Sequence, residues 1–321
     1  MTDFAPTGLT LIEVVKRHDP NGDMATIVDA LMQQNDILQD AVWREANDRF
    51  GNKATRWAKE PSGTWRKLTS GVAKERGETV EMYDTIGMLD TISKSDIEII
   101  NAFRNPKQAR NDEAMAFIRG LGKTMASTMI YGSTATDPEK FNGLAIRMDA
   151  IAATANVINE GGTGSDLCSI FVVDWGVDTV HMLYPLNSKA GLEHTDMGVQ
   201  LVAATSTTDY RAYVDYFSWK AGLAVKNPKS VGRIANIEST GTTNIFDEDN
   251  LITLLNRMTK GPGRRIYCNQ TVLTQMEIRA KDKTNINYTK ADGIAPGMNL
   301  FFKGVPIRQV DQIVITEAAL S

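Results

Sequence analysis

The residue types that most often carry chemistry are few in this chain and lie far apart. Its two cysteines, Cys168 and Cys268, each lie in an apolar run, and neither has a second cysteine nearby for a zinc pair or a redox motif. Free cysteine is among the most buried residue types, so both are expected inside the fold. The three histidines, His18, His181 and His194, are too scattered for the usual spacing of metal ligands. The sequence therefore predicts neither a metal centre nor a bound cofactor.

Two glycine-rich runs resemble phosphate-binding loops only in part. GLGKT at 120–124 matches the end of a P-loop, but Phe117 stands where that motif needs glycine, and the run lies inside a helical pattern. GGTGSD at 161–166 precedes no amphipathic helix, so we interpret it as a turn. The chain also lacks a nucleophile elbow, a zinc-protease motif and an EF-hand loop. These observations favour a protein that is not an enzyme.

Composition and charge exclude several other classes. Apolar residues make up 42% of the 321 residues and charged residues 23%, which is typical of a globular chain and not of a disordered or fibrous one. The net charge of −4 and the pI of about 5.6 argue against specific binding of nucleic acid. No apolar run reaches the roughly 18 residues that a membrane helix needs. Asp3 stands where a signal peptide has positive charge, so we expect the protein to stay in the cytoplasm where it is made.

One long helix is the strongest predicted element. Asn105 is a favoured cap, Pro106 suits the first helical position, and Gly132 is placed to end the helix. Apolar side chains recur at steps of three and four, at Ala114, Ile118, Leu121, Met125 and Met129. Such a helix is about 39 Å long, more than twice the mean length in globular proteins.

Three further helices are predicted from spacing and capping residues. Residues 24–47 carry an apolar pattern that suits one helix or two short ones, with Asp23 as a possible cap. Residues 248–260 begin in the acidic run Asp247–Asp249, where a helix start explains the carboxylates without a metal ion. The third helix covers residues 270–280, after the cap Asn269.

Alternating apolar residues predict strands in the second half of the chain. SIFVVDWGVDTVHMLYP is expected to form two strands around Trp175-Gly176, and YRAYVDYFSWKAGLAV another two around Ala221-Gly222. RIYC is a further strand, and FFKGVPIRQVDQIVITE is expected to form one alternating strand with Pro306 near its start or at an edge. The class is therefore α+β with two intertwined lobes.

Three tryptophans gather in a region that cannot build its own core. Trp43, Trp57 and Trp65 lie within 23 residues, separated by polar and glycine-rich sequence. Residues 48–95 are expected to form a projecting hairpin, with the returning strands at 77–93. Exposed aromatic side chains favour a partner surface, so these three residues are candidate subunit contacts.

The order of these features resembles a known family. A long helix is followed by FNGL at 141–144, a strand-rich region, SWKAGLAVKNPKSVGRIANI at 218–237 and GVPIRQVDQIVITE at 304–317. This order is similar to that in the major capsid proteins of tailed bacteriophages, which adopt the Johnson, or Hong Kong 97-like, fold. The resemblance implies an N-terminal arm at 1–47, an extended loop at 48–95, a peripheral domain at 96–140 and 285–321, and an axial domain at 141–284.

The resemblance also implies a function and partners. The protein is expected to assemble with itself into hexamers and pentamers of an icosahedral shell around double-stranded DNA, without sequence-specific DNA binding and without a membrane. A separate scaffolding protein, a portal and a cement protein are implied as partners. The implied location is the virion, after assembly in the host cytoplasm. Two alternatives stay open at this point: an encapsulin-type compartment with the same fold, and a cytosolic enzyme with an unrecognised motif.

Overall fold

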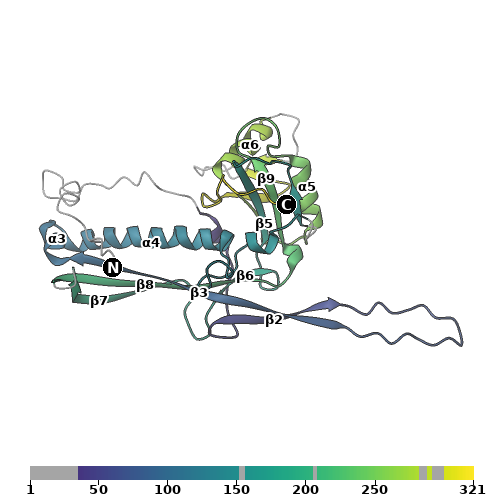
Figure 1. Cartoon of the computed structure of the whole chain (residues 1–321), viewed down its shortest axis with the longest axis horizontal. Helices are drawn as coiled ribbons and strands as arrows, with labels where there is room; N and C mark the ends of the chain where they lie inside the picture. Colours follow the sequence, from purple (N-terminus) through teal and green to yellow (C-terminus); the bar gives the residue numbers. More distant parts are fainter. Residues whose placement is uncertain (1–34, 152–155, 205–207, 282–287, 291–299) are drawn as a thin grey trace.

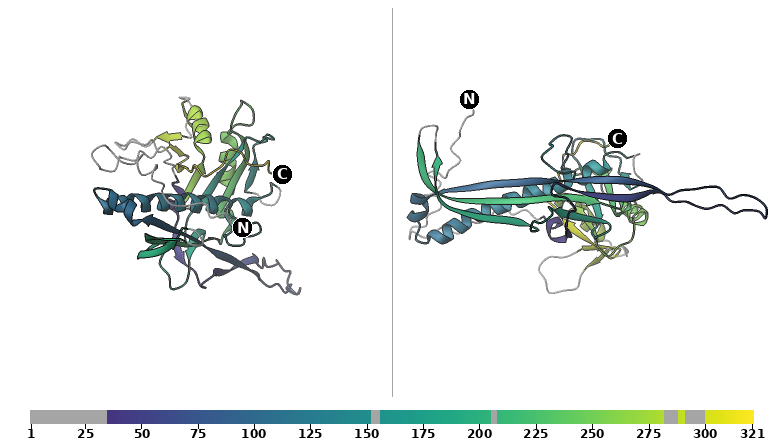
Figure 2. Two further views of the ribbon diagram at one scale, coloured as in Figure 1. Left: turned by 60° about the vertical axis from the view of Figure 1, so that its left-hand side comes forward. Right: turned by 90° about the horizontal axis from the view of Figure 1, so that it is seen from below.

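The computed structural model describes residues 35–151, 156–204, 208–281, 288–290 and 300–321. It has two sheets of different shape, with one long helix at their border (Figure 1). An elongated sheet extends along the long axis of the molecule, helix α4 lies along one of its faces, and a compact lobe with the second sheet stands at one end of α4 (Figures 1 and 2). This confirms the α+β class with two lobes.

The elongated sheet has six strands. Its order is β1-β6-β8-β3-β2, with β7 paired to β8. All neighbours are antiparallel except β1 and β6, which are parallel. The strands are β1 Trp43–Glu45, β2 Gly51–Lys59, β3 Glu78–Asp96, β6 Val180–Tyr184, β7 Leu192–Ala203 and β8 Asp209–Val225.

The predicted hairpin is confirmed for residues 51–85, whereas residues 86–95, which were also expected in it, belong to the body of the elongated sheet. β2 pairs with the first part of β3, from Gly51 opposite Thr85 to Lys59 opposite Glu78, and the rest of β3 pairs with β8. One strand therefore belongs both to the body of the molecule and to the projection.

The long helix α4, Pro106–Tyr131, has the predicted bounds. The Asn105 side chain accepts a hydrogen bond from the backbone N–H of Gln108, as expected of a cap. Only the second half is deeply packed: beyond Ala109, the buried residues begin at Leu121. Met115, in the first half, is 46% exposed within this chain. The short helix α3, Ile97–Ala102, precedes α4 at its exposed end.

The compact lobe contains a seven-stranded sheet of order β11-β12-β13-β10-β5-β9-β4. Helices α5, Glu248–Arg257, and α6, Gln270–Ala280, supply apolar residues to its core and are capped by Asp247 and Asn269 as predicted. Short elements complete the lobe and its border with α4: α2 Ile37–Asp40 and the 3-10 turns Ala145–Met148 and Pro228–Ser230. The strands are β4 Val157–Asn159, β5 Leu167–Asp174, β9 Val231–Glu238, β10 Arg264–Cys268, β11 Tyr288–Lys290, β12 Leu300–Phe302 and β13 Val305–Gln309.

Three predicted elements differ from the structure. The run at 209–225 is one strand and not two, because β8 continues through Gly222, where a Cβ would lie only 2.6 Å from the Thr85 carbonyl oxygen and the missing side chain leaves room for β3. The run from Phe301 to Glu317 is not one strand: it turns at Lys303-Gly304, and no strand follows β13 in the described residues 310–321. Of the predicted helix 24–47, the residues before 35 lie outside the described residues; within 35–47 the structure has the short helix α2 and then strand β1.

The sheets also group the chain differently from the expected domain boundaries. Residues 285–321 were expected in one domain with the long helix. Their strands β12 and β13 instead join the sheet that contains β10. Strands β6, β7 and β8 lie within 141–284, yet they pair with one another and with β3 in the elongated sheet. Strands β5 and β6, adjacent in sequence around Trp175-Gly176, separate into the two sheets.

Candidate assembly surfaces

The projecting hairpin presents large apolar side chains to solvent. Trp65 is fully exposed and Trp57 is 63% exposed, and Leu68 and Val72 near the tip are also exposed. The projection extends well beyond the body of the molecule (Figure 1). An isolated chain gains nothing from this exposure, because apolar surface in water is unfavourable by roughly 25 cal/mol per Å². We therefore expect a partner surface to cover these residues.

Local contacts give the projection a defined shape. The Glu75 carboxylate accepts hydrogen bonds from the backbone N–H groups of Ser62 and Gly63, at 2.8 and 3.2 Å, and ties the two sides of the tip together. Gly77 lies against the Trp57 ring, where an added Cβ would lie 2.6 Å from Cζ3. The absent side chain allows the indole to lie close to the returning chain.

Basic residues outnumber acidic ones on the projection. Strand β2 contains three basic residues and no acidic one, the tip adds four basic and two acidic residues, and the returning residues 78–85 add three acidic ones. Among the described residues, only Lys53 has an acidic partner across the hairpin, with its Nζ 2.9 Å from Glu81. The seven basic residues are all exposed: Lys53, Arg56, Lys59, Arg66, Lys67, Lys74 and Arg76.

Trp43, the third candidate contact, lies elsewhere. It begins β1, which lies at the opposite edge of the sheet from β2. Its ring stacks on the Trp219 ring, with the two centroids 6.2 Å apart. The side chain is half-buried and packs against the core beneath α4. The structure therefore does not bring Trp43 together with Trp57 and Trp65.

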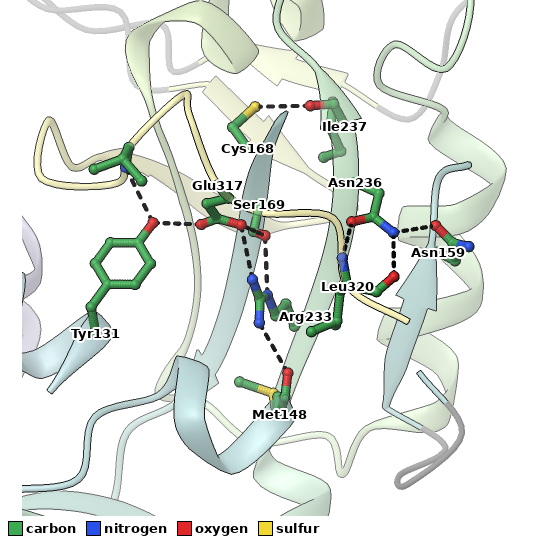
Figure 3. A network of polar contacts seen from close by, with 11 residues as sticks. Tyr131, Met148, Asn159, Cys168, Ser169, Arg233, Asn236, Ile237, Glu317 and Leu320 are labelled. Atoms are coloured by element: carbon green, nitrogen blue, oxygen red, sulfur yellow. Dashed lines mark hydrogen bonds and ion pairs between the residues drawn. The ribbon is translucent and has the colours of Figure 1, made fainter. Parts of the chain in front are cut away.

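A buried polar junction joins the end of α4 to the compact lobe (Figure 3). It is formed by Tyr131 on α4, Ser169 on β5, Arg233 on β9 and Glu317 in the C-terminal segment. The Arg233 guanidinium lies 2.8 Å from the Glu317 carboxylate, and both side chains are less than a tenth exposed. Tyr131 and Ser169 each donate a hydroxyl hydrogen bond to the same carboxylate. Burial, and then the Glu317 charge, raise the pKa of Tyr131, so the phenol stays a proton donor.

The guanidinium and the chain end are held by further bonds in the same region. Arg233 donates to Ser169 Oγ at 3.0 Å and to the Met148 carbonyl oxygen at 3.0 Å. Asn236 accepts from the Leu320 backbone N–H at 2.8 Å and donates to the Leu320 carbonyl oxygen at 2.9 Å. The C-terminal segment is therefore fixed across β5 and β9 (Figure 3). Sequence reasoning missed this network, although a charged residue in each of two apolar runs, VGRIANI and IVITEAA, is its visible signal.

A second charged cluster attaches the exposed half of α4 to the elongated sheet. Arg110 donates to both carboxylate oxygens of Asp215 on β8, at 3.0 and 2.7 Å, and also bonds Asp196 on β7. Its guanidinium lies over the Tyr213 ring, 4.9 Å from the centroid. His194 Nε2 lies 2.9 Å from the same Asp215 carboxylate. Hydrogen bonding from Arg110 holds the pKa of Asp196 below its usual value.

Both cysteines and His181 are buried, whereas His194 is exposed, and these residues are dispersed over the described structure. Cys168 and Cys268 are buried and reduced, as predicted, and burial raises the pKa of the Cys168 thiol to about 12. Burial lowers the pKa of His181 to about 4, so this imidazole is neutral near pH 7. GLGKT lies within α4 as predicted, with its backbone in the helix. Among the described residues, no three or more His, Cys, Asp or Glu side chains are grouped to hold a metal ion.

In the described ranges, no helix is both long enough and apolar enough to cross a membrane.

A family model described as major capsid protein GP7 matches residues 19–321 of this chain. Among solved structures, a chain of bacteriophage epsilon15 is 27% identical and has a TM-score of 0.76, with 100% of this chain and 99% of that chain covered. A search of curated protein sequences finds no match.

Two more distant structures have lower similarity. The bacteriophage JBD30 capsid is 11% identical over 90% of this chain and 95% of that chain, with a TM-score of 0.48. The SrpI encapsulin of Synechococcus elongatus PCC 7942 is 11% identical over 73% of this chain and 98% of that chain, with a TM-score of 0.45. The comparison therefore rests on the family model and on the epsilon15 chain.

Proposed function

This chain belongs to the major capsid protein GP7 family and is a shell-forming capsid protein of a tailed bacteriophage, and from this premise we propose how its parts build the shell. The observation that carries the proposal is the projecting hairpin, whose tryptophans are exposed in the isolated chain. The hairpin lies over an adjacent subunit, and Trp57 and Trp65 enter that subunit's surface. Trp43 acts differently: it stabilises β1 within its own subunit through Trp219.

The two lobes take the two roles that the family resemblance implies. The elongated sheet with α4 is the peripheral domain, and the seven-stranded sheet with α5 and α6 is the axial domain that meets its copies around five- and six-fold axes. We assign β12 and β13 to the axial domain and β6 to β8 to the peripheral domain; the support is the sheet in which each strand pairs. The buried junction at Arg233 and Glu317 then fixes the orientation of one domain to the other.

Several partners belong to the same proposal. The shell encloses double-stranded DNA without sequence-specific binding. The net charge of −4 on each chain supports this, because tight binding of DNA requires basic surfaces. A separate scaffolding protein, a portal and a cement protein take part in assembly, which occurs in the host cytoplasm. The protein has no catalytic role; the burial of both thiols and of His181 supports this. The alternative of an encapsulin-type compartment also makes a shell, but the family match favours the phage head.

Negative-stain electron microscopy of the purified chain, expressed with and without its neighbouring genes, tests the shell. Closed shells or rings of five or six subunits are expected. Small discrete particles under every condition would contradict shell formation.

The hairpin contact is tested by Trp57→Ala and Trp65→Ala, with Trp43→Phe as a control that keeps the intramolecular stack. The two alanine variants should fold normally, because neither ring is buried in the subunit, and should give few or no shells. Circular dichroism checks folding, and sedimentation measures shell yield. Normal yields from both alanine variants would refute the proposed role of the hairpin.

A further inference from the structure

The elongated sheet has one face that no described helix covers. Leu89 and Thr91 of β3 face α4, where they line a space together with Phe117 and Leu121. Successive side chains of a strand point to opposite faces, so Met88 lies on the other face. Seen from below, the strands lie in front of α4, and this face is presented to the viewer (Figure 2).

A groove of about 910 Å³ lies where this face meets the segment after β6. Its lining includes two strongly exposed apolar side chains, Phe50 at 69% and Met88 at 62%, and Leu186, which is 37% exposed. Together they form an apolar surface in contact with solvent. Grouped exposure of this kind is typical of a binding surface and differs from isolated exposed residues.

The groove wall is built by backbone bonds and turns. The Asn187 backbone N–H donates to the Glu45 carboxylate at 2.8 Å, and the Ser188 N–H donates to the Pro185 carbonyl oxygen at 3.1 Å. Asn187 and Gly191 have positive φ values of 63° and 99°, conformations that asparagine and glycine adopt most readily. The wall is therefore formed before any partner arrives, which reduces the entropy lost on binding.

Positive charge dominates the residues that line this groove. Arg49, Lys189 and Lys220 contribute three cations, and Lys220 lies directly opposite Met88 in the pairing of β8 with β3. Glu193 is the one acidic side chain among the lining residues. His194, also at the groove, interacts with Asp215. A ligand that complements this lining carries negative charge beside apolar groups.

We propose that this groove binds an acidic peptide segment with apolar side chains, supplied by another protein. The apolar side chains of the segment would cover Phe50 and Met88, and its carboxylates would meet Lys189 and Lys220 at the rim. The projecting hairpin of a second copy complements this lining less well, because its exposed charged residues are seven basic and four acidic ones. The site goes beyond shell formation, because it is complete within one subunit.

Fluorescence anisotropy on the unassembled full chain tests the site with three labelled synthetic peptides. One alternates glutamate and leucine, the second alternates lysine and leucine, and the third alternates glutamate and serine. Only the glutamate–leucine peptide should bind, and its affinity should fall as salt is added, since rim charges are screened.

Two variants and a control locate the binding. Lys189→Glu combined with Lys220→Glu should weaken binding at least tenfold, and Met88→Ser should weaken it severalfold, with unchanged circular dichroism. Lys260→Glu combined with Lys303→Glu makes the same charge change at exposed positions of the compact lobe and should leave affinity unchanged.

Four results would overturn the proposal. These are no binding of the glutamate–leucine peptide at millimolar concentration, equal binding of the lysine–leucine peptide, or unchanged affinity in both groove variants. The fourth is self-association of the chain that Met88→Ser abolishes, since a second copy would then occupy the groove.

Discussion

Replacing Glu317 by alanine removes the carboxylate at the centre of the junction between α4, β5 and β9. Arg233 would stay buried, about 5% exposed, and would keep only its bonds to Ser169 and to the Met148 carbonyl oxygen. Breaking a buried ion pair costs about 3–5 kcal/mol, because the remaining charge is left without compensation. Since two hydrogen bonds to Arg233 survive, we expect a loss near the lower end, about 3 kcal/mol of the free energy of unfolding.

Two further variants separate charge from shape. Glu317→Gln keeps the volume and an acceptor oxygen but loses the charge, so it should cost about 1–3 kcal/mol. Arg233→Met combined with Glu317→Leu removes both charges together. Replacing a buried pair by apolar groups is often close to neutral, so this double variant should cost clearly less than the sum of its single changes.

Urea unfolding of the unassembled chain, followed by circular dichroism and by tryptophan fluorescence, measures these energies. The free energies of the variants can be compared if circular dichroism and fluorescence report the same single unfolding transition. Two results would refute the reasoning that the pair is a coupled, buried unit. One is a loss in the free energy of unfolding below about 1 kcal/mol for Glu317→Ala, and the other is a loss in the double variant that equals the sum of the losses in the two single variants.

Three other predictions concern buried groups. Because burial lowers the pKa of His181 to about 4, the unfolded chain binds a proton at this residue at a higher pH than the folded chain does. The free energy of unfolding should therefore fall on the order of 1–3 kcal/mol as the pH drops from about 6.5 toward 4. In urea titrations at each pH, His181→Gln should reduce this pH dependence. Cys168 and Cys268 should resist iodoacetamide at about pH 8, near the ordinary pKa of a thiol, until urea unfolds the chain, and rapid labelling of the native protein, seen by mass spectrometry, would contradict their burial. Gly222→Val should destabilise by about 1–3 kcal/mol through its close approach to β3, whereas Ala224→Gly, on the same strand, should mainly reduce packing; equal thermal shifts would argue against the contact.

Elements with local sequence signals could be predicted before the fold was known. The cap Asn105, Pro106 and Gly132 define α4 because capping and chain termination depend on neighbouring residues only. The same holds for the starts of α5 and α6 at Asp247 and Asn269. The hairpin was also predictable, because Trp57 and Trp65 among polar residues cannot form a core of their own, whereas Trp43 packs against the core of the body.

Which distant segments share a sheet became visible in the folded chain alone. β5 and β6 look like one hairpin in sequence, but pairing of β5 with β10 and of β6 with β8 places them in different lobes. Gly222 reads as a turn until β3 is seen to pass close beside it. The buried pair of Arg233 and Glu317 joins residues 84 positions apart, and no local pattern specifies such a contact. Its existence depends on burial, which removes water from both charges and which the folded chain alone supplies.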